Sequence, residues 1–577
     1  MNNAIRVNHD TGKFLPDSLQ VHTWEDIAPY YNDLTDRPLN DLEALEQWIY
    51  DKSALDAAVS EAFSWMYIAI SRNNQNQEAM EQYQFAIQHI QPKVAEQENV
   101  LNQRLVSSPF FTELDEETFG IYVRKVQNAV DLFCPDNVPL STEVQLKSKE
   151  YGRIFSQMTI GLEGRQLTLQ KASTLLEEKD RSRRQAVYHK INQRILQDTE
   201  ELDNLFDELL QRRHNIALNA GFENYREYAF RSLNRFDYSP QDCEDFHQSI
   251  ADEIVPLLNE LYIDRRNALD LDKLRPWDLH IDARGQEPLH PYDSMEDFLS
   301  KGVSCISHLD PQFGKVIRKM DHMGHIDLES RKGKRPGAYN MPLFVSGVPF
   351  LFMNASYSIN DLRTLMHESG HAIHSYLTKD LSLSSDRSFP SEISELAAMT
   401  MELLSLEHWD VFFSSEEDLK RAKINQLELV LKVLPWIAVV DKFQHWLYTN
   451  PHHDREERKA YWSNLVRSYT SSVVDYSGME HYVDYLWHKQ LHVFEVPFYY
   501  VEYGFAQLGA IAIWRKYRQN PTEAIQQYKK ALQLGYTKSI GEVYQAAGIE
   551  FDFSKSYVQQ LGAFVREELR TLVGDTN

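Results

Sequence analysis

Apolar residues recur at every third or fourth position through most of the first 260 residues of the chain. The stretches at 42–70 and 196–221 keep this spacing over many turns, and Pro and Gly are sparse inside them. The spacing matches the turn of an α-helix and places the apolar side chains on one face. The first half of the chain is therefore predicted to consist of long amphipathic helices.

Composition changes between about residues 275 and 357. Here Pro, Gly and aromatic residues interrupt short apolar runs, such as VSGVPFLFMNAS at 345–356. Runs of this kind are typical of short strands and turns. A helical pattern resumes near Asn360 and continues, with loops, to the end of the sequence. We predict a mainly α fold with one small β-sheet.

No Gly/Ser/Pro-rich linker or low-complexity tract divides the 577 residues into separate modules. One or two closely packed lobes are the better expectation for such a chain.

The charge of the chain argues against a nucleic-acid partner. The formal net charge is -25, and the RKGKR run at 331–335 is the only dense basic stretch. Affinity for nucleic acid depends largely on Lys and Arg side chains that neutralise phosphates. We therefore interpret 331–335 as a solvated loop and expect no nucleic-acid partner.

No segment predicts a membrane anchor. Residues 1–19 lack the apolar core of a secretory signal, and no uncharged apolar run is long enough to cross a bilayer. We therefore expect a cytoplasmic protein without a membrane partner. The three cysteines, Cys134, Cys243 and Cys305, are odd in number and widely spaced. This pattern predicts reduced thiols, with neither a disulfide framework nor a Cys-based zinc site.

The motif HESGH at 367–371 carries the clearest chemistry. It lies in a helical pattern that begins near Ser358, so His367 and His371 stand one turn apart on the same face. Two imidazoles placed in this way can bind one zinc ion. Glu368, which follows the first of them, is placed to act on the water that the metal activates.

A zinc site that catalyses a reaction needs a third protein ligand, and a second helical segment at 391–404 offers one. Glu395 stands 24 residues after His371, and Glu402 follows two turns later on the same face. Glu392 is the rival ligand. With Ser391 as the helix cap, however, Glu392 falls in the first turn, where a carboxylate stabilises the helix end. We favour Glu395.

Four segments together resemble a known family. They are RKGKRPGAYN at 331–340, HESGHAIHSYL at 367–377, SELAAMTMELL at 394–404 and HVFEVPFYYVEYGFAQLGA at 492–510. Their order and spacing resemble the oligoendopeptidase F branch of the thimet-oligopeptidase-like zinc peptidases. The resemblance implies a two-lobed helical body with a deep substrate channel, and a small β-sheet beside the zinc site.

The resemblance also implies roles for individual residues. His367, His371 and Glu395 are expected to bind one zinc ion per chain, with Glu368 as the general base. Glu402 would support a ligand, and His492 and Tyr503 would face the substrate carbonyl. His374 is expected, from its own position three residues after His371, to orient a ligand or the substrate. A further set is expected to contact the substrate: Tyr499 or Tyr500, between which the PFYYVEY segment leaves the choice open, and Gly337 and Ala338.

We therefore expect a helical region at 1–190 and a catalytic region at 191–577. The expected function is zinc-dependent endo-cleavage of short, unstructured oligopeptides. Two alternatives stay open. One is a helical H-E-x-x-H carboxypeptidase or peptidyl dipeptidase, and the other is a catalytically silent scaffold that binds peptides.

Overall fold

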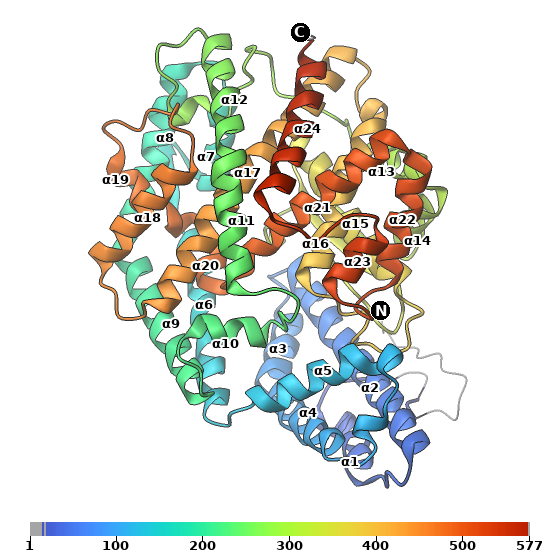
Figure 1. Ribbon diagram of the computed structural model, residues 1–577. Coiled ribbons are helices and arrows are strands. Elements are labelled where there is room, and N and C mark those ends of the chain that lie inside the picture. Colours follow the sequence, from blue (N-terminus) through green and yellow to red (C-terminus); the bar gives the residue numbers. More distant parts are fainter. Residues whose placement is uncertain (1–13, 17–18, 575–577) are drawn as a thin grey trace. The chain divides into compact units, whose positions relative to one another are not determined.

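A computed structural model describes residues 14–16 and 19–574 of the chain (Figure 1). The expectation about a secretory signal rests largely on residues 1–13, 17 and 18, which lie outside the described residues. Helices dominate the described part, as the sequence predicts.

The described chain separates into two compact units, and each is built from segments that are distant in the sequence. The first unit comprises the residues up to Leu132, His290–Leu419 and Gly509–Phe551. The second comprises Phe133–Leu289, Lys420–Leu508 and the residues from Asp552 onward. The boundary expected at residue 190 separates a helical region from a catalytic region, and this division stays a prediction.

The α-helices and strands of the first unit have the following bounds: α1 (Ala28–Asp36), α2 (Leu42–Arg72), α3 (Gln77–Phe85), α4 (Gln91–Val106), α5 (Glu116–Leu132), α13 (Met295–Leu309), α14 (Pro311–His322), β3 (Ile326–Glu329), β4 (Tyr339–Met341), β5 (Phe350–Ala355), α15 (Ile359–Leu377), α16 (Ser391–Ser405), α22 (Pro521–Gln533) and α23 (Ile540–Ala546).

The second unit contains these elements: α6 (Asn137–Ser156), β1 (Thr159–Leu162), β2 (Arg165–Thr168), α7 (Leu169–Thr174), α8 (Arg181–Leu196), α9 (Thr199–Asn219), α10 (Tyr225–Ser232), α11 (Pro240–Glu253), α12 (Val255–Ala268), α18 (Arg455–Tyr469), α19 (Glu480–Val483), α20 (Leu491–Glu495) and α24 (Lys555–Val573). Two helices cross the unit boundaries: α17 (Glu416–Thr449), which lies mostly in the second unit, and α21 (Tyr500–Gln519), which begins there and ends in the first.

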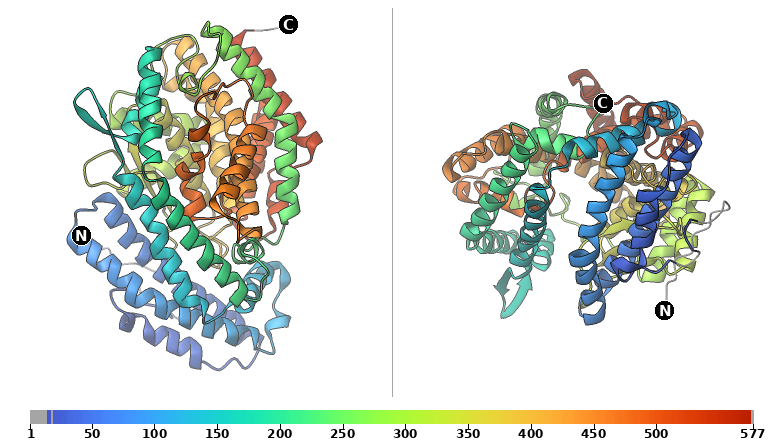
Figure 2. Two further views of the ribbon diagram at one scale, coloured as in Figure 1. Left: turned by 90° about the vertical axis from the view of Figure 1, so that its left-hand side faces the viewer. Right: turned by 90° about the horizontal axis from the view of Figure 1, so that it is seen from below.

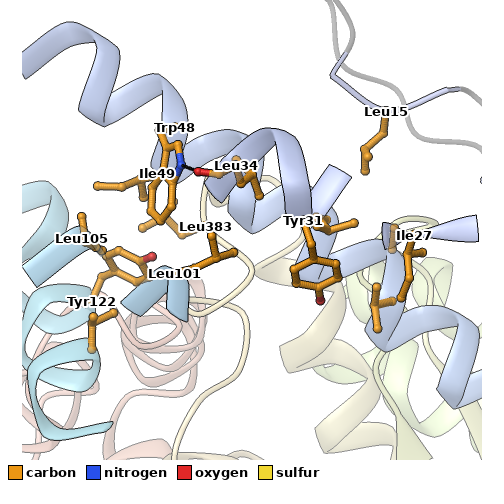
Figure 3. Packing of buried hydrophobic residues seen from close by; sticks show 14 of the residues in the cluster. Leu15, Ile27, Tyr31, Leu34, Trp48, Ile49, Leu101, Leu105, Tyr122 and Leu383 are labelled. Atoms are coloured by element: carbon orange, nitrogen blue, oxygen red, sulfur yellow. Dashed lines mark hydrogen bonds between the residues drawn. The ribbon is translucent and has the colours of Figure 1, made fainter. Parts of the chain in front are cut away.

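The N-terminal helices share one apolar core, part of which Figure 3 shows. Trp48 of α2 is fully buried there, and its indole N–H donates a hydrogen bond of 2.8 Å to the carbonyl oxygen of Leu34. Leu101 and Leu105 of α4 pack into the same cluster from one face. The spacing of these residues along α2 and α4 is the helical period that the sequence displays, so the predicted helices of this region are confirmed.

The predicted sheet exists and occupies only the last part of the 275–357 region. It has three strands in the order β3-β5-β4, with β3 parallel and β4 antiparallel to β5. The central strand β5 carries the apolar run, which is buried because neighbours cover it. α13 and α14 fill much of the region that the composition assigned to strands, so that part of the interpretation is wrong.

A second, smaller sheet escapes the sequence reasoning. Strands β1 and β2 form an antiparallel hairpin that appears as a pair of teal arrows in Figure 2. Glu163 and Gly164 join the strands, and both have positive φ. Positive φ at both central residues is what a tight hairpin turn requires. The pair Glu-Gly between two short strands is the signal that could have revealed it.

The basic run at 331–335 is only partly the solvated loop that its charge suggests. Lys334 is buried, and its ammonium group donates hydrogen bonds to Asp327 of β3 and to the carbonyl oxygen of Met353 of β5. Burial would raise the pKa of Asp327, but the hydrogen bonds from Arg331 and Lys334 outweigh it and lower the pKa to about 2. This charge network ties the loop before β4 to the sheet.

Within the described part of the chain, none of the helices is both long enough and apolar enough to cross a bilayer.

Candidate metal centre and a second cluster of polar side chains

Helix α15 begins where the sequence predicts. Ser358 caps it, and the backbone N–H of Ser358 donates a hydrogen bond of 2.8 Å to the carboxylate of Asp361, which completes a capping box. The carboxylate of Asp361 also accepts a hydrogen bond of 2.6 Å from the hydroxyl of Tyr292. The start of the helix is thereby fixed, and the helix packs against β4 and β5.

Helix α16 lies directly beside α15 (Figure 1). The close approach depends on Gly370, inside the HESGH motif. A Cβ atom at Gly370 would lie 2.6 Å from the Cα atom of Ala398 and 2.7 Å from the carbonyl oxygen of Ala397. Because both contacts are with backbone atoms, a side chain at this position could not be accommodated by a rotamer change. Gly370 therefore sets the distance between the two helices that carry the candidate ligands.

His367, His371 and Glu395 come together at this contact, with ligand atoms within 4.8 Å of one another. Oε2 of Glu395 lies 3.4 Å from Nε2 of His367 and 3.9 Å from Nε2 of His371. Among the described residues, Glu395 is the carboxylate that completes this group, and its rival Glu392 is not part of it. Two imidazole nitrogens and one carboxylate oxygen are the donors expected of a catalytic zinc site.

The other ring nitrogen of each histidine is already engaged. Nδ1 of His367 lies 2.8 Å from Oε1 of Glu402, and Nδ1 of His371 lies 3.1 Å from Oγ of Ser394. A carboxylate can only accept here, so Nδ1 of His367 donates a hydrogen bond to Glu402, and Nε2 is the nitrogen that faces Glu395. Such partners orient imidazoles for metal binding.

Ser394 is a contributor that the sequence reasoning missed. It precedes Glu395 on α16, and its hydroxyl reaches His371 across the helix contact. A small polar residue beside a candidate ligand is too common a pattern to be noticed without the structure. The predicted cap of this helix is also wrong: α16 starts at Ser391, after Pro390, and the side chain of Ser391 is not the cap. Glu392 does fall in the first turn, as expected.

The site is rich in carboxylates, and its two candidate histidine ligands are partly exposed. Burial would lower the pKa of His367, but the hydrogen bond to Glu402 and the charges of Glu395, Glu402 and Glu368 outweigh it and raise the pKa to about 10. Burial is the main cause that raises the pKa of Glu368 to about 7, with Glu395 and Glu402 adding to it. Burial and the charge of His367 lower the pKa of His371. Three carboxylates around two imidazoles create an environment that favours a cation.

Glu368 is itself buried, on the helix that carries both histidines. Its Oε2 atom makes no hydrogen bond to any residue in the described ranges. A buried carboxylate oxygen without a partner is costly, and such atoms are found where a ligand or a water completes the site.

His374 lies in a different environment. Its ring is fully buried and stacks on Phe389 with centroids 3.6 Å apart. Neither ring nitrogen has a hydrogen-bond partner among residues 14–16 and 19–574, and burial lowers the pKa of His374 to about 3. Among the described residues, His374 therefore makes no hydrogen bond through which it would support a ligand.

Among the described strands, β4 pairs with β5 alone and so forms an edge of the three-stranded sheet. Gly337 and Ala338 precede it and are exposed. Gly337 has φ of 99°, which favours glycine, and a Cβ atom there would meet no other atom within 4 Å. Asn340 of β4 lies 3.5 Å from the hydroxyl of Ser375 on α15. The edge thus runs beside the helix that carries the candidate ligands.

His492, Tyr499, Tyr500 and Tyr503 form a second cluster, which belongs to the second unit. The ring of His492 lies 4.8 Å from that of Tyr500, 5.9 Å from that of Tyr503 and 6.0 Å from that of Tyr499. All four side chains are partly exposed. Both tyrosines between which the sequence left a choice therefore contact His492.

Hydrogen bonds determine which nitrogen of His492 carries the proton. The indole N–H of Trp436 donates to Oε1 of Gln490 over 3.1 Å, so the amide nitrogen of Gln490 faces Nδ1 of His492, 2.7 Å away. Burial lowers the pKa of His492 to about 4, which makes the ring neutral at pH 7. Because Nδ1 accepts, the proton lies on Nε2, which is a hydrogen-bond donor.

A strained turn places the tyrosines. Phe498, just before α21, has φ of 67°, which is unusual for a bulky residue. Its N–H donates to the side chain of Gln444 over 2.8 Å, and its carbonyl oxygen accepts from Arg235. Arg235 also pairs with Glu502 over 2.6 Å. The buried contacts hold this turn and so fix the first turn of α21.

Two family profiles match the chain. The profile described as peptidase family M3 matches residues 174–563, and the one described as the peptidase M3 N-terminal domain matches residues 14–133. The first match covers more than half of the chain. The chain therefore belongs to peptidase family M3. Its pair of histidines lies on α15, and the carboxylate of the site lies on α16.

Among curated proteins, the chain is 23% identical over 401 residues to an oligoendopeptidase F homolog of Borreliella burgdorferi. The aligned part covers 67% of this chain and 66% of the relative. The chain is also 23% identical over 406 residues to an oligoendopeptidase F homolog of Lactococcus lactis, covering 67% of this chain and 63% of the relative. The chain thus spans less than two thirds of the length of these relatives.

Among solved structures, the fold is similar to that of Pz peptidase A with an inhibitor, with a TM-score of 0.89 and 24% identity, covering 97% of this chain and 99% of the other. It is also similar to oligoendopeptidase F from Enterococcus faecium, with a TM-score of 0.64 and 15% identity over 96% of this chain and 97% of the other. These likenesses confirm the mainly α fold class that the sequence predicts.

Proposed function

We propose that this chain is a zinc-dependent endopeptidase that hydrolyses short, unstructured oligopeptides. The observation that carries the proposal is the convergence of His367, His371 and Glu395, with both Nε2 atoms turned toward the Glu395 carboxylate. Family membership supports the class of reaction. The relatives named oligoendopeptidase F support a preference for oligopeptides.

The donor set fits zinc. His367 and His371 would each offer Nε2, and Glu395 would offer a carboxylate oxygen, which leaves a coordination position open. When bound, a zinc ion would supply Lewis acidity that polarises the scissile carbonyl and lowers the pKa of water. Glu402 and Ser394 would hold the two imidazoles in position. His374, on the same helix, stays a proposed support of the ligands, although its ring makes no hydrogen bond to any described residue.

Glu368 is the proposed general base. Its buried carboxylate, with pKa raised to about 7, takes a proton from the attacking water and returns it to the leaving amine. A base whose pKa lies near the working pH can both accept and release the proton.

His492 and Tyr503 are the proposed donors to the carbonyl oxygen. Nε2–H of His492 and the hydroxyl of Tyr503 would stabilise the negative charge that develops there. Since these residues belong to the second unit and the ligands to the first, their joint action on one substrate is part of the proposal. Tyr499 and Tyr500 would contact the neighbouring residues of the peptide.

The extended peptide would bind along β4, with Gly337 and Ala338 at the start of the edge. An exposed strand edge binds peptide through backbone hydrogen bonds, which suits varied side-chain sequences. A deep channel, oligopeptide partners and a cytoplasmic location complete the proposal.

Metal content tests the ligand set. His367→Ala, His371→Ala and Glu395→Ala should each lower bound zinc, because each removes one of the three proposed donors. Ser394→Ala serves as the matched comparison, since it removes a partner of a ligand and should weaken zinc binding by about 10- to 100-fold without abolishing it. Full zinc occupancy in purified Glu395→Ala, together with unchanged activity, would place the third ligand elsewhere.

The tautomer of His492 gives a second test. Gln490→Glu keeps the acceptor for Trp436 but presents an acceptor to Nδ1, which draws the proton there and removes it from Nε2. We expect kcat to fall about 100-fold, the cost of one lost oxyanion donor, with KM nearly unchanged. Nitrogen chemical shifts of the histidine rings report the tautomer directly. A proton on Nδ1 of His492 in the unsubstituted protein would show that the assigned network is wrong.

A further inference from the structure

A second cluster of metal-binding residue types lies in the second unit. Cys243 and His247 stand one turn apart on α11, and Asp441 and His445 stand one turn apart on α17. Residues four apart share one face of a helix. Two helices thus bring two pairs of such residues together, although the pairs are almost 200 residues apart in the sequence.

The three residues Cys243, Asp441 and His445 have ligand atoms within 4.8 Å of one another. The same holds for His367, His371 and Glu395. Nε2 of His445 lies 3.2 Å from Oδ2 of Asp441. His247 adds a contact of 2.8 Å between its Nε2 and the same carboxylate oxygen. All four side chains are buried, with exposed fractions of 2% or less.

Four polar atoms in this cluster lack a hydrogen-bond partner. Oδ1 of Asp441, both ring nitrogens of His445 and Nδ1 of His247 make no hydrogen bond with any residue among those that the structure describes. Phe498 and Phe230 pack edge-on against the ring of His445, with centroids 5.4 and 5.8 Å away, so the surroundings are apolar. A buried polar atom without a partner is unfavourable, and a bound ion would offset that cost at Asp441.

We propose that Cys243, Asp441 and His445 form a second, structural metal site that takes a zinc ion. Sulfur, nitrogen and oxygen donors together suit zinc and exclude calcium and magnesium, which prefer oxygen donors alone. On binding, the thiol of Cys243 releases its proton, and the thiolate and the Asp441 carboxylate balance the two positive charges of the ion.

His247 has a separate task. Its Nε2–H donates to Oδ2 of Asp441 and leaves Oδ1 for the ion. This arrangement orients the carboxylate, as the partners Glu402 and Ser394 orient the imidazoles of the first site.

The site would brace the turn before α21. Gln444 precedes His445 on α17 and accepts the hydrogen bond from the N–H of Phe498, whose ring contacts His445. An ion that joins α11 to α17 beneath this turn would hold Phe498 in its strained conformation. The proposed function does not depend on this second ion, and the second ion does not depend on the proposed function.

Metal analysis separates the two sites. The full chain carrying His367→Ala and His371→Ala lacks the first site, and after zinc loading and gel filtration it should retain about one zinc ion per chain. Adding Cys243→Ser to that variant should reduce the content to near zero. Adding Cys305→Ser instead, at another buried cysteine, should leave it unchanged. A double variant that retains no zinc would overturn the proposal.

Cobalt substitution of the unaltered protein gives a test that does not depend on variants that fold poorly. Of the two proposed sites, only the second contains sulfur, so only it can produce thiolate-to-cobalt charge-transfer absorption. We expect this absorption in the cobalt-loaded protein and its loss in Cys243→Ser, with retention in Cys305→Ser. Cobalt uptake without the thiolate band in the unaltered protein would refute the site, whatever the peptidase activity.

Discussion

Glu368→Gln should lower kcat by about 100- to 10,000-fold while bound zinc stays at the level of the unaltered protein. The amide keeps the size of the side chain but cannot accept the proton from water. The carboxylate is buried, and the charges of His367, Glu395 and Glu402 influence its pKa. None of these three residues can take the position that Glu368 occupies on α15. Zinc content by mass spectrometry and kcat on a fluorogenic peptide measure the two effects in one preparation.

Zinc content and kcat have to be considered together. Loss of turnover with full zinc content assigns the proton transfer to Glu368, whereas loss of both would mean that the substitution disturbs the ligands. Activity within a factor of two of the unaltered protein would show that another group removes the proton.

Gly370→Ala should destabilise the first unit and disturb the metal centre at the same time. The added methyl group would lie 2.6 Å from the Cα atom of Ala398, so α15 and α16 must move apart. Overpacking of this kind costs about 1–3 kcal/mol, and contact with the backbone favours the upper end. Because His371 lies on one helix and Glu395 on the other, zinc affinity should fall as well.

Gly541→Ala is the matched control. Gly541 lies in α23, and a Cβ atom there would meet nothing within 4 Å. Replacing a helical glycine at an open position should be neutral or stabilise the protein by up to about 1 kcal/mol. Chemical denaturation and zinc titration compare the two variants. Equal stability and zinc affinity for Gly370→Ala and Gly541→Ala would mean that the close helix contact does not maintain the site.

Local pattern was sufficient to predict the helix of the first site. The spacing of His367 and His371 and the resumption of helical periodicity near Asn360 both refer to one continuous segment, and α15 has these features. Glu395 could be proposed because it also lies on a strongly periodic segment. The resemblance to oligoendopeptidase F proteins supplied the roles that periodicity cannot give, those of His492 and Tyr503.

Features that depend on contacts between distant segments were not predictable. Ser394 was missed because only the packing of α15 on α16 brings its hydroxyl to His371. The expectation of no Cys-based zinc site follows from the absence of a short Cys/His motif that contains Cys243, Asp441 and His445, and the proposed second site departs from that expectation. The partial burial of the 331–335 run depends on Asp327, whose charge compensates Lys334 inside the sheet region. In each case tertiary structure supplies a partner that local pattern does not contain.

The most direct test of the central claim is to map the products from an unstructured peptide of ten to fifteen residues that is blocked at both ends. Zinc-loaded protein should cut it at internal bonds, a chelator should stop the reaction, and added zinc should restore it. Mass spectrometry of the early products identifies the bonds. Internal cleavage that follows the zinc content and is absent in Glu368→Gln is the result we expect. Intact peptide at every zinc concentration, or products shortened only in steps from the carboxyl end once that end is unblocked, would contradict an endopeptidase and favour a silent scaffold or a carboxypeptidase.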